Sequence, residues 1–227
     1  MEGDSNLKGV LFIVSTPIGN LADITLRAVE TLKRVDGVVC EGFRQASTLL
    51  KKLGIPDKEL FLLDEHDDGS QAEFILRELL KGRRLALISD CGTPGFEDPG
   101  SRLVAHCLEN VISVVPLPGA SSLMAALSVS PIPLKNFYFA GFLPQKKAMR
   151  EKEFQKLKRL KDPLVLMDTP YRLGRLLVEV CEYLGGNRLV TLALDLTLPG
   201  EAILHGRADE IRARVADRKG EFILIVH

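Results

Sequence analysis

The sequence has no tryptophan and only three tyrosines among its 227 residues. Proteins that hold single-stranded nucleic acid without sequence preference commonly stack its bases on aromatic side chains, and few such platforms are available here. Neither sign of charge is in excess, because 30 Lys and Arg residues balance 30 Asp and Glu residues. Since proteins that bind long nucleic acids non-specifically are usually basic overall, any nucleic-acid ligand would have to be held by a local patch.

Long hydrophobic runs are also absent. The apolar run at 10–14 follows a polar start and is far too short for a signal peptide or a membrane-spanning helix, so we expect a cytoplasmic protein without a membrane segment. The four cysteines, Cys40, Cys91, Cys107 and Cys181, form no CxxC pair and lack the spacing of metal ligands. We expect them to be reduced residues of the core.

What the sequence does contain is an ordinary globular composition, with 46% hydrophobic and 26% charged residues. In the first half, short apolar runs alternate with stretches whose apolar residues recur at helical spacing. The expected strands are 10–15, 37–40, 60–63, 84–89 and 113–117, and the expected helices are 25–35, 44–53, 71–81 and 100–110. This alternation is typical of βαβ units, so we predict an α/β fold whose N-terminal domain, residues 1–118, has a mostly parallel sheet of about five strands.

The second half has a different pattern and is predicted to form a C-terminal α/β domain, residues 119–227, with a mixed sheet and flanking helices. The expected strands are 137–140, 163–167, 188–195, 201–206 and 221–226, and helices are expected in the charged run 146–161, at 171–184 and between the last two strands. The strands at 188–195 and 201–206 follow one another closely, which indicates an antiparallel hairpin.

Three loops that follow expected strands have the composition of a binding site. They are the Pro- and Gly-containing loop at 15–25, the loop at 89–100 with three glycines and three carboxylates in twelve residues, and the loop at 116–122, which ends in two serines. Strand-to-helix loops usually have two to six residues, so the middle loop is unusually long. Because ligands bind outside the carboxyl ends of parallel strands, we expect one cleft at this edge of the sheet.

Four strings of the sequence carry a resemblance to a known family. They are STPIGNLADITLRAVETLKRVD at 15–36, LISDCGTPGFEDPGSRLV at 87–104, VVPLPGASSLMAALSVS at 114–130 and FAGFLP at 139–144. In their residues and in their order along the chain, these strings resemble the motifs of the tetrapyrrole methylase superfamily. Within it, they resemble the branch that methylates a ribose 2′-hydroxyl in small-subunit ribosomal RNA. The resemblance implies a two-domain methyltransferase that is a homodimer, holds no metal, and uses S-adenosylmethionine as donor, with S-adenosylhomocysteine as product.

The resemblance also implies which residues contact the methyl donor. The matching motif positions are Pro17, Ile18, Gly92, Thr93, Phe96, Ser121, Ser122, Met167, Leu194 and His205. Charged residues that follow two further strands are the candidates for catalysis on the acceptor side, and they are Glu41, Arg44, Asp168 and Arg172.

Each catalytic candidate also has a structural interpretation. Glu41 and Arg44 could orient the acceptor or transfer a proton, or they could form a salt bridge at the start of a helix. Asp168 could bind the acceptor or cap the helix at 171–184. In the first of the three loops, Asp23 is expected to cap the helix that follows, with contact to the substrate as the alternative.

The sequence departs from the family's pattern mainly on the acceptor side. Where relatives have Ala-Glu-Asp-Thr-Arg, Cys-Glu-Gly-Phe-Arg stands at 40–44, so Gly42 and Phe43 replace two polar residues. A histidine of the relatives is replaced by Tyr171, and an arginine and a lysine are replaced by Leu194 and Leu198. Since Arg and Lys commonly contact phosphates, these changes leave the acceptor open between ribosomal RNA, a small molecule such as a tetrapyrrole-like ring, another RNA position, and no acceptor at all in a donor-binding module.

Two charged stretches have both a functional and a structural interpretation. The run at 146–161 is the most basic of the chain and is either a solvated helix face or the patch that an RNA ligand would need. His66 stands in the acidic stretch 64–68, which we interpret as a solvated loop because no second histidine is nearby.

Overall fold

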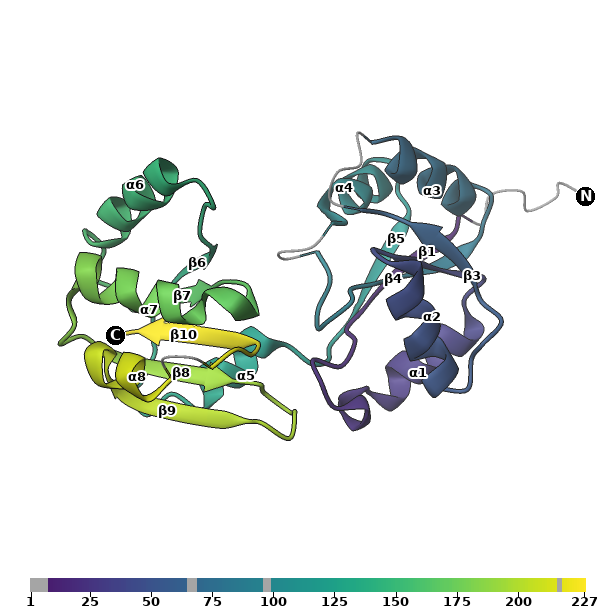
Figure 1. The fold of residues 1–227 in the computed structure, drawn as a ribbon. Helices are drawn as coiled ribbons and strands as arrows, with labels where there is room; N and C mark the ends of the chain where they lie inside the picture. The colour runs from purple at the N-terminus through teal and green to yellow at the C-terminus, as the bar shows by residue number, and fades with distance from the viewer. Residues whose placement is uncertain (1–7, 65–68, 96–98, 216–217) are drawn as a thin grey trace, which may run out of the picture. The chain divides into compact units, whose positions relative to one another are not determined.

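The computed structural model describes residues 8–64, 69–95, 99–215 and 218–227 (Figure 1). The chain divides into two compact units, Met1–Ser121 and Ser122–His227. Of the residues singled out in the sequence, Phe96 and His66 lie outside the described ranges.

The first unit alternates strands and helices along the chain. Its elements are β1 (Val10–Val14), η1 (Leu21–Asp23), α1 (Leu26–Arg34), β2 (Gly37–Cys40), α2 (Phe43–Lys52), β3 (Glu59–Leu62), α3 (Ser70–Leu80), β4 (Arg84–Ile88), α4 (Ser101–Glu109) and β5 (Ser113–Leu117). The strands lie in the order β3-β2-β4-β1-β5, and neighbouring strands are parallel throughout. The predicted five-stranded parallel sheet is confirmed.

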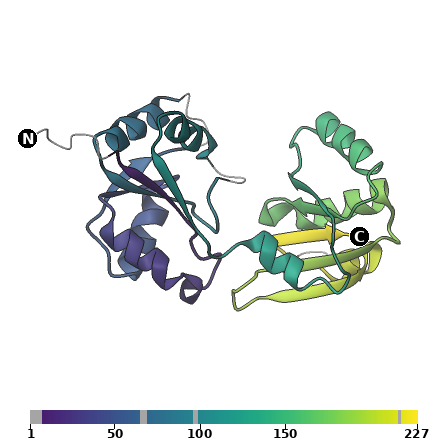
Figure 2. The ribbon, with the colours of Figure 1, turned by 180° about the vertical axis from the view of Figure 1, so that it is seen from behind.

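Helices cover both faces of this sheet, which is why its strands are apolar on both sides. Leu32 of α1 and Leu50 of α2 are buried against one face, and Ile75 of α3 and Leu103 of α4 are buried against the other (Figures 1 and 2). The neighbouring strands β1 and β4 therefore lead to helices on opposite faces. Such a divergence opens a crevice at the carboxyl ends of the two strands, where the predicted binding loops lie.

Thr25, and not Asp23, caps α1. The Thr25 hydroxyl Oγ1 accepts a hydrogen bond from the Ala28 backbone N–H at 3.1 Å, and its backbone is extended. Asp23 lies in η1, a short turn of 3-10 helix that Asn20 caps through its side-chain oxygen. The prediction for Asp23 is wrong because this extra turn separates it from the first turn of α1.

The second unit contains a mixed sheet. Its elements are α5 (Ser122–Ser128), β6 (Tyr138–Phe142), α6 (Lys147–Leu157), β7 (Leu164–Met167), η2 (Pro170–Arg172), α7 (Leu173–Val180), η3 (Cys181–Gly185), β8 (Leu189–Leu194), β9 (Ala202–Arg207), α8 (Ala208–Arg214) and β10 (Phe222–Val226). In the order β6-β7-β10-β8-β9, only β6 and β7 pair in parallel. The predicted mixed sheet and the hairpin of β8 and β9 are confirmed, which completes the predicted fold class.

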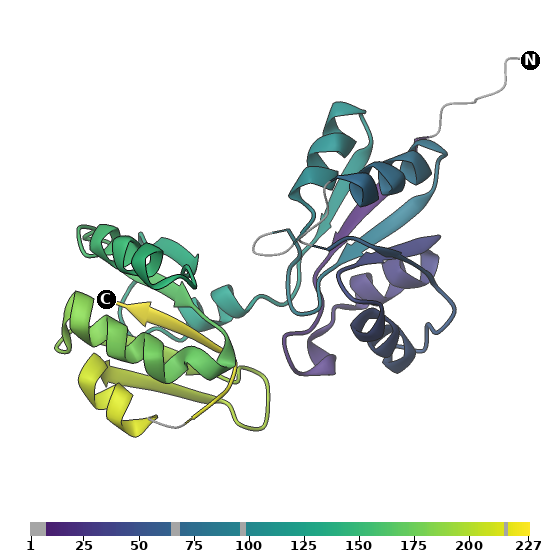
Figure 3. The same ribbon diagram turned by 45° about the horizontal axis from the view of Figure 1, so that its top comes forward.

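Helices α6, α7 and α8 pack on one face of this sheet, as the green-to-yellow part of Figure 3 shows. Phe154 of α6, Leu177 of α7 and Ile211 of α8 are fully buried in this core. The helix expected at 171–184 is a 3-10 turn, an α-helix and a π-helical end that follow one another from 170 to 185. No helix within the described ranges is long and apolar enough to span a membrane.

Candidate functional site

Side-chain and backbone hydrogen bonds hold the three predicted binding loops together at the carboxyl edge of the first sheet. The Thr93 hydroxyl lies 2.9 Å from the Ser15 hydroxyl and donates to the Ala120 carbonyl at 3.0 Å. The Thr16 backbone N–H donates to the Gly92 carbonyl at 2.8 Å. The loops that follow β1, β4 and β5 therefore form one connected surface, as the sequence predicts.

Two glycines allow the loops to approach this closely. A Cβ atom at Gly119 would lie 2.7 Å from the Ser15 Cβ, which is closer than Cβ atoms approach non-bonded atoms in folded proteins. Gly92 has a φ of +87°, and a Cβ atom there would lie 3.3 Å from Cγ2 of Ile18. Two of the expected donor contacts, Ile18 and Gly92, are thus neighbours across the loops.

The expected catalytic residues of the first unit lie beside these loops. Glu41 directly follows β2, and its Oε1 accepts a hydrogen bond from the Asp90 backbone N–H at 3.4 Å. Arg44 lies in the first turn of α2 and forms no ion pair with any residue that the structure describes. The salt bridge expected between Glu41 and Arg44 as a structural interpretation is therefore not formed within the described chain.

A pocket of about 550 Å³ opens next to Arg44, which is within the usual range of ligand sites. We call it the α2 pocket, and it is lined by residues of the β1 loop, α2 and the end of β4: Thr16, Pro17, Gly19, Leu21, Arg44, Gln45, Ala46, Thr48, Leu49, Lys52, Ile88, Ser89 and Asp90. Its wall contains the expected donor contact Pro17 and the expected catalytic residue Arg44. The sequence pattern gave no indication of the participation of Lys52, although its spacing of eight residues from Arg44 places both on one helix face.

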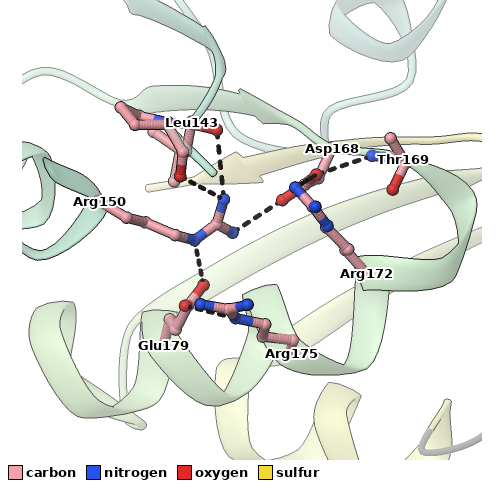
Figure 4. A network of polar contacts seen from close by, with 8 residues as sticks. Leu143, Arg150, Asp168, Thr169, Arg172, Arg175 and Glu179 are labelled. Atoms are coloured by element: carbon pink, nitrogen blue, oxygen red, sulfur yellow. Dashed lines mark hydrogen bonds and ion pairs between the residues drawn. The ribbon is translucent and has the colours of Figure 1, made fainter. Parts of the chain in front are cut away.

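Asp168, at the end of β7, is buried and its carboxylate is fully engaged (Figure 4). Oδ2 accepts from Nη2 of Arg150 at 2.8 Å, and Oδ1 accepts from the Thr169 backbone N–H at 2.8 Å. Nη1 of Arg172 lies 3.6 Å from Oδ1. The arrangement orients Arg172, which remains about one third exposed, with a side-chain exposure of 31%.

Arg150 is the centre of this network and was missed in the sequence. Its side chain is 2% exposed, and its Nε donates to Oε2 of Glu179 at 2.7 Å, while Arg175 donates to the other oxygen of Glu179 at 3.0 Å (Figure 4). For Arg150, both interpretations of the basic run 146–161 are wrong, because the residue is neither solvated nor available to RNA. The signal that identifies it is its position four residues before the buried Phe154, on the same face of α6.

The remaining expected donor contacts lie at the boundary of the two units and in the second unit. Ser121 ends the first unit and Ser122 begins α5. Met167 is the last residue of β7, and the Leu194 side chain is fully buried in the core, so that only its backbone can meet a ligand.

His205 lies on the opposite face of the sheet from the Leu194 side chain. Its Nδ1 lies 3.0 Å from the Thr191 hydroxyl, which also contacts Nε2 of His227 at 2.9 Å. Burial lowers the pKa of His227, and His205 and Arg188 lower it further. Across the described ranges, no three His, Cys, Asp or Glu side chains gather as metal ligands would.

Comparison with known sequences identifies a family over most of the chain. The sequence profile of the Tetrapyrrole (Corrin/Porphyrin) Methylases matches residues 10–212. A protein of Leptospira biflexa named Ribosomal RNA small subunit methyltransferase I is 38% identical over 221 residues, which is 97% of this chain and 91% of that protein. The protein of the same name from Escherichia coli O157:H7 is 41% identical over 229 residues, covering 99% and 80% of the two chains.

Solved structures show the same fold at low sequence identity. A uroporphyrin-III-C-methyltransferase from Thermus thermophilus superposes with a TM-score of 0.64 at 20% identity, covering 96% of this chain and 94% of that one. A second structure of the Thermus thermophilus enzyme, complexed with S-adenyl homocysteine, superposes with a TM-score of 0.64 at 17% identity and covers 96% of both chains.

Proposed function

Because this chain belongs to the tetrapyrrole methylase family, we propose that it transfers a methyl group from S-adenosylmethionine to a ribose 2′-hydroxyl of small-subunit ribosomal RNA. The family and the enzyme class expected from the motifs, a methyltransferase, are confirmed by the match over residues 10–212 and by the named relatives. The observation that carries the proposed acceptor is the α2 pocket, where Arg44 stands without an ion pair in the described chain beside the connected loops.

S-adenosylmethionine is the methyl donor, and when bound it supplies a methyl group activated by a sulfonium. The connected loops suit it, because Gly92 lacks a side chain where the backbone must approach a ligand and Thr93 is fixed by its hydrogen bonds. We assign its binding to the residues of the family's motif positions: Pro17, Ile18, Gly92, Thr93, Phe96, Ser121, Ser122, Met167, Leu194 and His205. S-adenosylhomocysteine is the product, as it is the ligand of one solved structure of the same fold.

On the acceptor side, we assign Arg44 to orienting the RNA and Glu41 to receiving the proton that the ribose hydroxyl loses when its oxygen takes the methyl group. Glu41 is held at the carboxyl edge by the Asp90 backbone N–H. In the second unit, we assign Arg172 to binding the acceptor, since its side chain is partly exposed, and Asp168 to orienting Arg172, since the carboxylate itself is buried.

We also propose that the chain forms a homodimer in the cytoplasm, as the family resemblance implies. Light scattering during size-exclusion chromatography gives the mass directly. A homodimer would have twice the mass of the 25.0 kDa chain.

The proposed activity is tested by titrating the protein with S-adenosylmethionine in a calorimeter and then incubating it with tritiated donor and small ribosomal subunits from cells that lack the modification. We expect saturable donor binding and label in the RNA. The Arg44→Ala variant is expected to lose at least 100-fold in transfer while keeping donor affinity, because an acceptor-orienting contact acts on the transfer step. Donor binding without label in wild-type reactions would contradict the ribosomal acceptor and favour a diverged acceptor or a donor-binding module.

A further inference from the structure

The α2 pocket has two cationic side chains on its helical wall. Arg44, Thr48 and Lys52 all line the pocket and are spaced four residues apart on α2. Residues with this spacing lie on one face of a helix. Neither Arg44 nor Lys52 forms an ion pair with a residue that the structure describes, so their positive charge is available to a ligand.

The hydroxyl groups of the pocket are committed to internal hydrogen bonds. Thr48 Oγ1 donates to the Arg44 carbonyl at 2.7 Å, and Thr16 Oγ1 donates to the Ser89 carbonyl at 3.0 Å. Ser89 Oγ donates to the Cys91 carbonyl at 3.2 Å. Arg44 and Lys52 are therefore the strongest hydrogen-bond donors of the lining that remain for a ligand. As cations, they favour an anionic ligand.

The lining of the pocket contains a carboxylate as well as the two cations. Asp90, two residues after β4, lines the pocket together with Arg44 and Lys52 of α2. A carboxylate repels a phosphate group but can accept a hydrogen bond from a ribose hydroxyl, whereas the cations attract a phosphate group. A lining with both kinds of group matches a sugar-phosphate backbone better than an isolated anion.

The remaining lining favours contacts to the nucleic-acid backbone over contacts to bases. Pro17, Leu21 and Leu49 provide apolar surface, and none of the described lining residues is aromatic, so the pocket has no platform on which a base would stack. Arg44 and Lys52 are eight residues apart, which is about 12 Å along a helix axis. This interval suits two phosphates of one strand.

We propose that the α2 pocket binds the sugar-phosphate backbone of the acceptor RNA, with Arg44 and Lys52 each contacting a phosphate of the strand that carries the methylated ribose, an assignment that rests on the function proposed above. Pro17 connects this pocket to the loops assigned to the donor, since it lines the pocket and follows Thr16, whose backbone N–H donates a hydrogen bond to the Gly92 carbonyl. An RNA strand bound at α2 would therefore lie beside the loops assigned to the donor. Lys52 is a binding residue that the sequence motifs do not identify.

The test compares two adjacent lysines. Lys52→Ala removes a charge that lines the pocket, and Lys51→Ala removes the charge of an exposed neighbour on the same helix that is not part of the lining. Binding of unmodified small ribosomal subunits is measured at several salt concentrations, together with tritium transfer and calorimetric titration with S-adenosylmethionine. Both substitutions are at exposed positions, so both variants are expected to fold.

We expect Lys52→Ala to weaken subunit binding by about three- to tenfold and to reduce the slope of log K against log salt by about 0.7, the value for one phosphate of a single strand. Donor affinity stays unchanged, and Lys51→Ala behaves as wild type. Equal effects of the two substitutions, or none, would overturn the phosphate contact even where wild-type protein labels the RNA.

The transfer reaction separates this inference from the function it rests on. Wild-type protein that binds subunits but transfers no label contradicts the proposed function, and the salt slopes of the two lysine variants then still decide the role of Lys52. Wild-type protein that neither binds nor labels the subunits overturns both.

Discussion

Each unit carries cationic residues on a helix that follows a strand, α2 after β2 and α6 after β6, and the two sets have opposite surroundings. In the first unit, Arg44 and Lys52 line an open pocket and form no ion pair within the described chain. In the second, Arg150 and Asp168 are both 2% exposed and bound to each other at 2.8 Å. The cations of α2 are therefore open to solvent, whereas Arg150 of α6 is part of an internal framework.

The difference follows from what surrounds each charge. A buried guanidinium must be paired, because the cost of removing it from water is offset only by close carboxylates and further hydrogen bonds. Arg150 meets this condition with Asp168 and Glu179 and with the Leu143 carbonyl at 3.4 Å. Lys52 is exposed and keeps its hydration, so it needs no partner within the protein.

Removal of Arg150 should have the largest effect. We expect Arg150→Met to destabilise the second unit by about 3–5 kcal/mol, because the buried Asp168 loses its closest cation and Glu179 keeps only Arg175. Urea unfolding followed by tyrosine fluorescence reports on this unit alone, since all three tyrosines, Tyr138, Tyr171 and Tyr183, belong to it.

The control for this substitution is Arg175→Met. It removes the other cationic partner of Glu179, and the Arg175 side chain is 50% exposed. We expect a loss within about 1 kcal/mol, as for other surface ion pairs. Equal losses from the two variants would show that the network is not a buried framework.

An added methyl group in the connected loops should have an intermediate effect. Gly92→Ala forces an L side chain into a φ of +87° and places its Cβ 3.3 Å from Ile18, so we expect donor affinity to fall about tenfold in calorimetric titration. Gly95→Ala provides a matched control, because its φ is +83° but no atom lies within 4 Å of the added Cβ. A loss as large for Gly95→Ala would assign the effect to backbone strain instead of to the contact with Ile18.

The smallest effect is expected in the rate of thiol labelling, which compares a cysteine of the first unit with one of the second without any substitution. Cys91 is exposed in the β4 loop, whereas burial raises the pKa of Cys40 to about 12, with Asp90 and Glu41 contributing, and that of Cys107 to about 11. We expect Cys91 to be labelled first near pH 8, and saturating S-adenosylhomocysteine to slow it about threefold or more by covering the loop. Cys181 of the second unit is the internal reference in mass spectrometry. A Cys91 rate that the ligand leaves unchanged would separate this loop from the donor site.

Much of the fold could be predicted because the relevant signals are local. The alternation of apolar runs with helical periodicity gave all five strands of the first sheet, and the short interval between β8 and β9 gave the hairpin. The same reasoning failed at Asp23, where an additional 3-10 turn could not be recognised and Thr25 provides the cap. The meeting of the three loops was also predictable, since Gly92 lies beside Ile18 and Thr93 beside Ser15, whereas the binding of the donor by these residues stays a prediction.

The parts that were not predicted depend on contacts between distant segments. Arg150 belongs to a run of lysines, and only its packing beside Phe154 separates it from its solvated neighbours. Lys52 likewise follows Lys51, and only the position of α2 beside the β1 loop decides which of the two faces the pocket. In both cases other cationic residues stand nearby in the sequence, and only the tertiary structure distinguishes the residue from them.

The most direct test of the proposed activity is mass spectrometry of nucleosides from small-subunit RNA that the purified protein has methylated with S-adenosylmethionine. The account predicts one new nucleoside whose added methyl group remains with the ribose when the glycosidic bond is broken, and its loss in the Arg44→Ala reaction. A methyl group that remains with the base, or RNA unchanged by a protein that binds the donor, would contradict it.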